Sequence, residues 1–305
     1  MTDAPRLFGA VEAGGTKFVA AIGDERGKVL AQERFPTSDP ASTLATVHAF
    51  LRKCSADLGP LAAIGVASFG PVELDKASAR YGSIGRTPKA GWSGTDIAGA
   101  FAREFACPVG FDTDVDAAAL AEHRWGAARD VDHLVYVTVG TGIGGGVLVN
   151  GVPIHGLMHP EIGHIYPRRH PLDREFPGVC PFHGDCLEGL ASGPAILARA
   201  GASLEQLGEA HPQRQIEADY LGQLCAQLVM TVSPRRIVMG GGVMKQAGLL
   251  PLIRRRSQHW LGGYIDRSEI LGRIDGFVVA PVLGDDAGIL GALVLAMDAA
   301  SSAVP

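Results

Sequence analysis

Apolar positions along the 305-residue chain follow two periods, one typical of helices and one typical of buried strands. Apolar residues at helical spacing predict helices over 41–58 and 95–105, the second through Ile97, Phe101 and Phe105. Short unbroken apolar runs bounded by Gly, Pro or Asp predict buried strands. Further helices are expected over 117–125, 192–200, 216–232, a segment ending at 260, and 287–297, and strands over 62–68, 109–111, 236–239 and 277–281. Strands that alternate with helices in this way predict an α/β fold.

The same short pattern of elements occurs once in each half of the chain. Residues 7–30, LFGAVEAGGTKFVAAIGDERGKVL, and residues 134–154, LVYVTVGTGIGGGVLVNGVPI, each predict a strand, a glycine turn, a second strand, a tight turn and a third strand. Because the chain is longer than one compact core usually holds, the repeat predicts two β-rich lobes. We place the lobes at 1–116 and 117–284, with a final helix over about 285–300 that can pack back on the first lobe.

Both glycine turns lead into a strand, which separates them from the common nucleotide-binding loops. A P-loop and a Rossmann fingerprint each require a helix at this point, whereas Phe18–Ile22 and Val147–Val149 are short, apolar and β-branched. Glycine lets backbone N–H groups point at phosphate oxygens without a Cβ in the way. We therefore interpret the matched pair as two backbone clamps for one polyphosphate. Ordinary glycine-rich hairpins are the alternative.

Composition and charge narrow the choice of partner and compartment. A net charge of −5 without a dense Lys/Arg run argues against nucleic acid as the main partner. No apolar run is long enough to span a bilayer, and the N-terminus lacks the pattern of a signal peptide, so no membrane is expected as a partner. The five Cys are scattered apart from Cys180 and Cys186, which favours reduced thiols in a cytoplasm over a disulfide framework.

The segment DTDVDAAALAEH places Asp112, Asp114 and Asp116 where a predicted strand gives way to a helix. Ligand sites of α/β proteins gather at the carboxyl ends of strands. A carboxylate there can take a proton from a substrate hydroxyl or hold Mg²⁺. The alternative is capping of the helix, and we expect one of the three aspartates to serve as that cap.

The stretch VCPFHGDCLEG offers three metal ligands on one tight loop, Cys180, His183 and Cys186. Structural Zn²⁺ takes four ligands, so the fourth must come from another segment. Free thiols beside a surface histidine are the alternative, and a Cys–His nucleophile fits the even spacing less well. The candidates for the fourth ligand are His155, His159, His164 and His170.

Two further glycine-containing turns follow predicted strands in the second half. IVMGGGV places Gly240–Gly242 between a strand and a helix, where a flat ring such as adenine can lie against the backbone. Close packing of the strand on the helix explains these glycines equally well. PVLGDDAG is interpreted as the start of the last helix, with Asp285 or Asp286 as its N-cap.

Taken in order, these motifs resemble those of the ROK family of sugar kinases over nearly the whole chain, and within it those of the bacterial zinc-containing fructokinases. VEAGGTKF resembles the first phosphate motif, with Glu12 where many relatives have Asp, and TVGTGIGGG resembles the second. TDVDAAALAE is similar to the stretch with the catalytic Asp, HPEIGH and CPFHGDCLEGLASGP to the sugar and zinc signature, and IVMGGGV to the adenosine motif. The resemblance implies a two-lobed actin-like ATPase fold of the hexokinase-like, ribonuclease H-like class.

The resemblance also implies roles for individual residues. Asp114 would be the general base that takes the proton from the sugar hydroxyl, and it would contact that substrate. The fourth zinc ligand would be His164, beside Cys180, His183 and Cys186. Contacts to the sugar would come from Asp114, Glu161, His164 and Glu188. Contacts to ATP would come from Gly14, Gly15, Thr16, Lys17, Thr141, Gly142, Pro194, Gly241 and Gly242.

Two positions depart from the family pattern. His183 stands where many relatives have a third Cys in the loop, and histidine remains a good Zn²⁺ ligand. Asp116 stands where an Asn is common, two places after the base. A second carboxylate there can raise the pKa of the base or bind a cation, so the sequence leaves the role of Asp116 open.

The activity that the resemblance implies is an ATP-dependent hexose kinase, a fructokinase that makes fructose 6-phosphate, with Mg²⁺ on the phosphates and structural Zn²⁺. It also implies a homodimer whose small-molecule partners are the sugar and ATP. The same machinery could act on mannose, glucose or an N-acetylated amino sugar, because a few hydroxyl contacts set that choice. A sugar-sensing repressor of the family is disfavoured, since only residues 1–6 precede the first strand. A zinc module that binds nucleic acid is disfavoured by the acidic balance.

Overall fold

The computed structural model describes residues 5–302, which divide into two compact units. No helix among the described residues combines the length and the apolar character needed to cross a bilayer. Residues 1–4, on which part of the expectation about the N-terminus rests, lie outside the described range. The first unit comprises the chain up to Glu122, Pro153–His159 and the chain from Asp285 onward, and the second comprises His123–Val152 and Pro160–Gly284.

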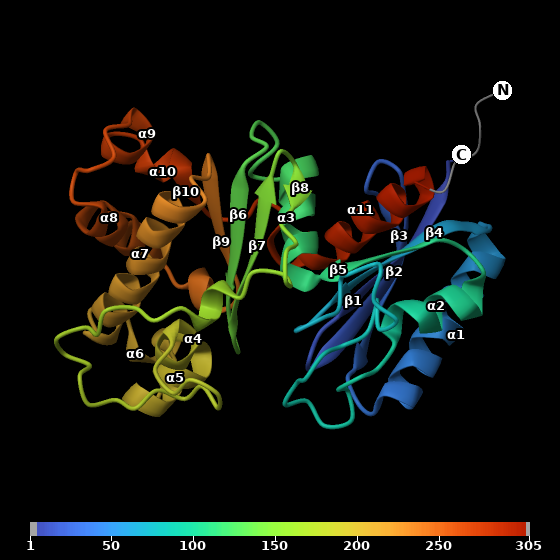
Figure 1. The fold of residues 1–305 in the computed structure, drawn as a ribbon, viewed down its shortest axis with the longest axis horizontal. Coiled ribbons are helices and arrows are strands. Elements are labelled where there is room, and N and C mark those ends of the chain that lie inside the picture. Colours follow the sequence, from blue (N-terminus) through green and yellow to red (C-terminus); the bar gives the residue numbers. More distant parts are fainter. Residues whose placement is uncertain (1–4, 303–305) are drawn as a thin grey trace. The chain divides into compact units, whose positions relative to one another are not determined.

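The first unit is built on a five-stranded mixed sheet (Figure 1). Its strands are β1 (Leu7–Ala13), β2 (Lys17–Asp24), β3 (Val29–Pro36), β4 (Leu61–Ser68) and β5 (Val109–Thr113). They lie in the order β3-β2-β1-β4-β5, with β1 antiparallel to β2 and parallel to β4. Its helices are α1 (Pro40–Leu58), α2 (Ile97–Phe105), the start of α3 (Asp114–Arg124) and α11 (Ala287–Ser302).

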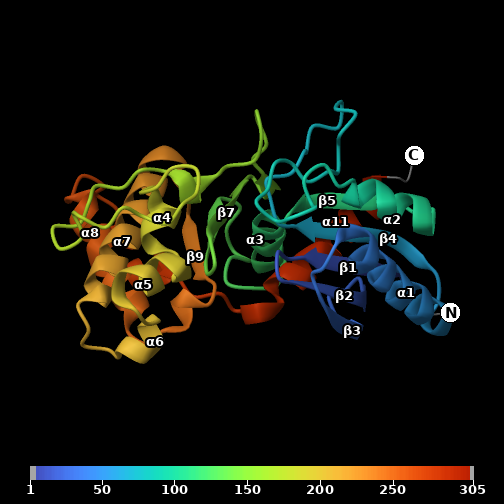
Figure 2. The ribbon, with the colours of Figure 1, turned by 90° about the horizontal axis from the view of Figure 1, so that it is seen from below.

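Helices cover both faces of this sheet, and the alternation of side chains along β4 shows how. Ile64 and Val66 point into the core that also contains Phe101 of α2. Gly65, between them, points to the opposite face, where α11 runs across β1, β4 and β5 (Figures 1 and 2). A Cβ at Gly65 would lie only 1.8 Å from the carbonyl oxygen of Ala292. Glycine is therefore required where the backbone of α11 touches the sheet.

The second unit contains another five-stranded mixed sheet, except for Pro153 at its edge, where the chain passes to the first unit. Its strands are β6 (Leu134–Val139), β7 (Ile143–Val149), β8 (Val152–Pro153), β9 (Arg236–Gly240) and β10 (Val278–Val279). The strands lie in the order β10-β9-β6-β7-β8, with β6 antiparallel to β7 and parallel to β9. The two longest helices, α7 (Gln213–Thr231) and α8 (Leu249–Leu261), pack against each other. The shorter helical segments are η1 (Ile162–His164), α4 (Leu187–Ala191), α5 (Gly193–Ala200), α6 (Leu204–Leu207), η2 (Val243–Lys245), α9 (Ser268–Leu271), α10 (Ile274–Phe277) and, at the end of the unit, η3 (Gly284–Asp286).

The predicted α/β class is confirmed, and so is the strand, glycine turn, strand motif of each half. Three predicted elements are present but shorter than expected. The third strand of the second repeat is only the two-residue β8, because Pro153 cannot continue the ladder. The predicted strand over 277–281 is reduced to β10 after the short helix α10. The helix expected directly after Gly242 begins only at Leu249, since Gly248 turns the chain with φ +79°.

Candidate active site

Asp114 is the first residue of α3 and directly follows β5. Thr113 caps the helix, because its Oγ1 accepts a hydrogen bond from the Asp116 N–H at 3.0 Å. The same hydroxyl donates to Asp116 Oδ2 at 2.9 Å. The cap is therefore Thr113 and not one of the three aspartates. It fixes Asp114 in the first turn of the helix, at the carboxyl end of a parallel strand.

Two glycines of α11 allow the surroundings of Asp114 to pack closely. A Cβ at Gly291 would lie 2.0 Å from the carbonyl oxygen of Ala117, in the first turns of α3. A Cβ at Gly288 would lie 2.5 Å from the carboxyl carbon of Glu12, on β1. This packing role was not predicted from the sequence. The available signal was a pair of glycines three apart in an otherwise apolar helix, which usually has a packing reason.

The surroundings of Asp114 hold its pKa far above that of a free carboxyl. The side chain is half-buried, and desolvation, followed by the negative charges of Glu12 and Asp116, raises the pKa of Asp114 to about 7. Burial also raises the pKa of Glu12, against the opposing charges of Lys17 and Arg34. A carboxyl group with a pKa near 7 can take up a proton during a reaction and release it again at neutral pH.

The first glycine turn joins β1 to β2 and lies in the same unit as Asp114. The Gly14 N–H donates to the carbonyl oxygen of Lys17 at 3.0 Å, and Thr37 Oγ1 donates to the carbonyl oxygen of Gly14 at 2.8 Å. A Cβ at Gly14 would lie 2.7 Å from the Lys17 carbonyl oxygen, whereas Gly15 has open space around it. The turn is thus a tight backbone structure with open space at its tip.

The second glycine turn joins β6 to β7 and is held by two later segments. The Gly140 carbonyl accepts a hydrogen bond at 2.7 Å from the N–H of Gly193, the first residue of α5. Glu188, in α4, accepts the Ile143 N–H on its Oε2 at 2.9 Å. A Cβ at Gly142 would lie 2.6 Å from that same oxygen. Glu188 therefore connects this turn to the cysteine-containing loop that precedes α4.

Gly241 and Gly242 follow β9 and lie beside the second turn. Gly241 has φ +93°, and a Cβ there would lie 2.4 Å from the carbonyl oxygen of Val139, the last residue of β6. The start of α5 is also near, since a Cβ at Gly193 would lie 4.0 Å from the Val243 side chain. The second unit thus brings together all the ATP-contact residues predicted within it, Thr141, Gly142, Pro194, Gly241 and Gly242.

The residues predicted to contact the sugar from the second unit also lie on adjoining segments. Glu161 directly precedes η1, His164 ends it, and Glu188 lies in α4. The Leu187 N–H donates to the carbonyl oxygen of Ile165 at 2.8 Å and so joins these segments. Burial and the negative charge of Glu188 raise the pKa of Glu161 to about 7. Two carboxyl groups close to each other can share the hydroxyl protons of a bound polyol.

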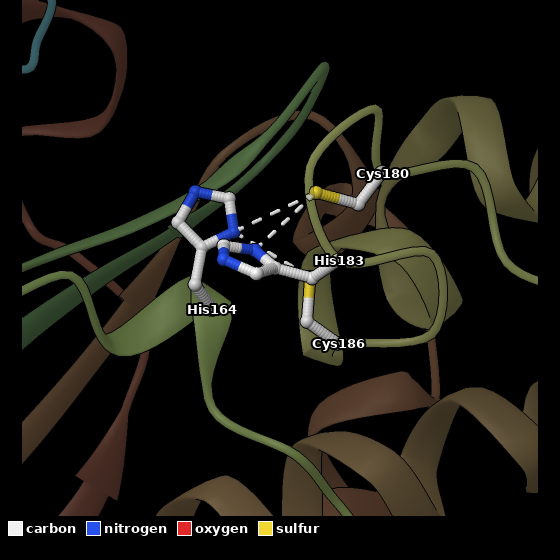
Figure 3. Close-up of side chains that lie close together, drawn as sticks. All are labelled: His164, Cys180, His183 and Cys186. Atoms are coloured by element: carbon white, nitrogen blue, oxygen red, sulfur yellow. Dashed lines mark hydrogen bonds between the residues drawn. The ribbon is translucent and has the colours of Figure 1, made fainter.

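Four side chains converge on one point in the second unit: His164, Cys180, His183 and Cys186 (Figure 3). His164 Nδ1 lies 3.4 Å from Cys186 Sγ and 3.8 Å from Cys180 Sγ. Cys180 Sγ lies 3.7 Å from His183 Nδ1. A tetrahedral zinc site with bonds of about 2.0–2.3 Å places its ligand atoms about 3.3–3.8 Å from one another. The two cysteines are free thiols, so these four residues could hold a metal ion of this kind.

Backbone hydrogen bonds close the loop that carries three of these ligands. Cys180 and Gly184 exchange two such bonds, at 3.2 and 2.9 Å, and the Val179 N–H donates to the carbonyl oxygen of Gly189 at 3.0 Å. A Cβ at Gly189 would lie 1.9 Å from the Gly184 carbonyl oxygen. The loop is thus folded tightly by its own backbone, which presents the ligand side chains from a fixed support.

Of the four candidate histidines, His164 is the one that joins the cluster. His159 is buried in the first unit, where its Nε2 accepts the Val72 N–H at 3.2 Å. His170 accepts a backbone N–H two residues further along the chain. His155 lies in the first unit beside two aspartates.

Comparison with known proteins extends over nearly the whole chain. The ROK family model matches residues 8–299. A fructokinase of Zymomonas mobilis is 46% identical over 302 residues, which cover 98% of this chain and 99% of that protein. A ROK hexokinase from Thermus thermophilus has a similar structure, with a TM-score of 0.80 and 27% identity over 97% of this chain and 99% of that one. A ROK glucokinase from Streptomyces griseus, in complex with glucose and AMPPNP, has a TM-score of 0.74 and 25% identity over 97% of this chain and 100% of that one.

Proposed function

The chain belongs to the ROK family, and we propose that, as a sugar kinase of that family, it transfers the γ-phosphoryl group of ATP to D-fructose, giving ADP and D-fructose 6-phosphate. The position and the raised pKa of Asp114 are the observation on which this proposal rests. Asp114 is a half-buried carboxyl at the end of a parallel strand, in the same unit as the first glycine turn, with a pKa raised to about 7. Fructose is favoured because the identity to the Zymomonas fructokinase is nearly twice that to the Streptomyces glucokinase.

Asp114 would act as the general base of the transfer. Its carboxylate takes the proton of the sugar 6-hydroxyl while that oxygen forms a bond to the γ-phosphorus and the bond to the β–γ bridging oxygen breaks. The transition state of such a transfer is loose, so positioning and charge stabilisation supply most of the rate. The backbone of the two glycine turns would cradle the phosphates, because N–H groups without a neighbouring Cβ can approach phosphate oxygens closely. ATP enters as its Mg²⁺ complex, and Mg²⁺ neutralises phosphate charge.

The nucleotide and sugar contacts that we propose divide between the two units. In the first unit the phosphate contacts are Gly14, Gly15, Thr16 and Lys17. In the second unit the phosphate and adenosine contacts are Thr141, Gly142, Pro194, Gly241 and Gly242. In addition to Asp114, the proposed sugar contacts are Glu161, His164 and Glu188. Adjoining segments carry the last three, and the raised pKa of Glu161 supports a hydroxyl-binding role.

We also propose that His164, Cys180, His183 and Cys186 hold a structural Zn²⁺. The distances between their donor atoms and the Cys₂His₂ donor set support this assignment. Four protein ligands leave no position for a reacting water, so this metal would be part of the scaffold. It would hold His164, and through the loop Glu188, in the wall of the sugar site.

A coupled assay of ADP release across a panel of hexoses, with Mg²⁺ and ATP, tests the proposed activity. The highest kcat/KM is expected with fructose. Best turnover with glucose or mannose would overturn the specificity while leaving a hexose kinase, and absence of turnover on every sugar would overturn the kinase itself. The homodimer and the cytoplasmic location remain predictions, which sedimentation velocity and cell fractionation test.

A further inference from the structure

A short segment of the first unit, Pro153–His159, is flanked on both sides by chain that belongs to the second unit. We call this segment the strap. Two histidines tie it to the first unit, His159 through a backbone N–H and His155 through two carboxylates. His155 Nε2 lies 3.2 Å from Asp112 Oδ1 and 3.8 Å from Asp116 Oδ2. These are the two aspartates that flank the proposed base in the sequence.

Asp112 and Asp116 are a buried pair of carboxylates, with exposed fractions of 4% and 1%. Asp116 Oδ2 is bonded to Thr113 Oγ1, while Asp116 Oδ1 has no hydrogen-bond partner among the described residues. Two buried carboxylates repel each other, and each is costly to keep ionised unless a cation lies beside it. His155 is the side chain that reaches both, from the strap.

We propose that His155 is a positioning residue for Asp114: its ring bridges Asp112 and Asp116, holds Asp116 in place beside the base, and offsets the negative charge of the pair. This inference rests on the proposed function, in which Asp114 is the base. Asp116 lies two residues after Asp114 in the first turn of α3, and its negative charge raises the pKa of the base.

The charges that surround the ring and the base agree with this bridge. The hydrogen bond to Asp112 and the ion pair with Asp116 raise the pKa of His155 to about 10, so the ring is positively charged at neutral pH. Burial raises the pKa of Asp116 to about 6, against the effect of its ion pair with His155. Tyr81 lies near the other carboxylate, and burial raises the pKa of that phenol. The base itself faces Glu12 of β1 and Asp116 of α3, which both raise its pKa.

Loss of the positive ring should therefore make Asp114 harder to ionise. The variant His155→Gln keeps a polar side chain but removes the charge. We expect the acid limb of its pH profile of kcat/KM for fructose to move to higher pH by about one pH unit. At pH 7 kcat/KM should then be about fivefold lower than in the wild type, and near pH 9 it should approach the wild-type value. His259→Gln, an exposed histidine on α8 of the second unit, is the matched control and should leave the profile unchanged.

A second substitution separates this effect from simple damage to the fold. Asp116→Asn removes the charge that His155 is proposed to offset. The double variant His155→Gln/Asp116→Asn should therefore return the midpoint of the acid limb of the kcat/KM profile to the wild-type pH or below it. If His155 has only a structural role, His155→Gln should lower kcat/KM equally at every pH, and the added Asp116→Asn substitution should not restore it. Either of those results would overturn the proposal, and so would a stoichiometric metal ion that is lost from His155→Gln.

Nuclear magnetic resonance of the histidine rings tests the bridge without any turnover. In the wild-type protein the His155 ring should stay protonated to above pH 8, and in Asp116→Asn its pKa should fall by at least about one unit. A ring that titrates near its ordinary value in the wild type would overturn the bridge. Failure of the kinase proposal is seen separately, as a wild-type protein that turns over no hexose.

Discussion

Replacement of Gly241 by alanine should damage both the stability of the second unit and the binding of ATP. Its φ of +93° is a conformation that side chains rarely adopt. The new Cβ would lie 2.4, 2.5 and 2.7 Å from the carbonyl oxygen, the amide nitrogen and the carbonyl carbon of Val139. All three are backbone atoms of β6, the middle strand of its sheet, which is hydrogen-bonded on both sides and cannot move aside. Gly242→Ala is the matched control, because nothing lies within 4 Å of a Cβ there.

The expected loss can be worked out from these two causes. A left-handed backbone costs a residue with a side chain about 1–2 kcal/mol, and overpacking against an unyielding neighbour costs about 1–3 kcal/mol. Gly241→Ala should therefore lose about 2–5 kcal/mol of the free energy of unfolding, a large share of the roughly 5–15 kcal/mol that typical proteins have. With a denaturant slope of about 3 kcal/mol per M of urea, the midpoint falls by about 0.7–1.7 M.

Urea unfolding followed by circular dichroism measures this difference, and steady-state kinetics measure the KM for ATP. Gly242→Ala should unfold within about 0.5 kcal/mol of the wild-type protein, as substitutions without a new contact usually do. Gly241→Ala should also raise the KM for ATP more than the KM for fructose, because the displaced turn is the one proposed to contact adenosine. Equal stability of the two variants would mean that neither the contact with Val139 nor the positive φ limits the side chain at position 241.

Three further predictions concern the base, the metal cluster and helix packing. Asp114→Asn should lower kcat by about 10²–10⁴-fold, as loss of a general base does, while metal content and circular dichroism stay unchanged; a kcat within tenfold of wild type would move the base elsewhere. Because the proposed base, Asp114, would work when deprotonated and has a pKa of about 7, kcat/KM for fructose should rise with pH, from about one tenth of its plateau at pH 6 to about nine tenths at pH 8. Elemental analysis should detect zinc in the wild-type protein and none in Cys180→Ser, which should also raise the KM for fructose about tenfold or more, whereas Cys54→Ser, on α1, should change neither; full activity without zinc would reject the scaffold role. Gly291→Ala should lower kcat together with stability, since its Cβ would lie 2.0 Å from the Ala117 carbonyl oxygen, and unchanged values of both would contradict the role given to α11.

Some expectations from the sequence failed for reasons of local geometry. A strand over the whole of 277–281 would need backbone hydrogen bonds to β9 along its length. In that segment, Val278 and Val279 are the residues that pair with β9. The aspartates after β5 were expected to supply the helix cap, but the hydroxyl of Thr113 accepts the Asp116 N–H instead. Threonine and aspartate are both good N-caps. The choice between them depends on which oxygen the turn places over the exposed N–H groups.

The features that could be predicted from the sequence depend on residues that lie close together in the chain. A glycine turn between two apolar runs, and Cys and His three apart on one loop, set local backbone shape and ligand type whatever the rest of the fold does. The Gly14 turn and the loop from Cys180 to Cys186 accordingly lie in the structure as these short-range patterns predict.

Which of these residues contact one another depends on the tertiary structure. The three glycines 240–242 are alike in sequence, yet β6 crowds Gly241 and leaves Gly242 free. Glu188 reaches Ile143 across 45 residues, and His155 reaches Asp112 across 43. The pKa of Asp114 depends on burial and on the negative charge of Glu12, which lies on another strand, β1. Steric contact, burial and charge act through space at a few ångströms, so only a folded chain specifies them.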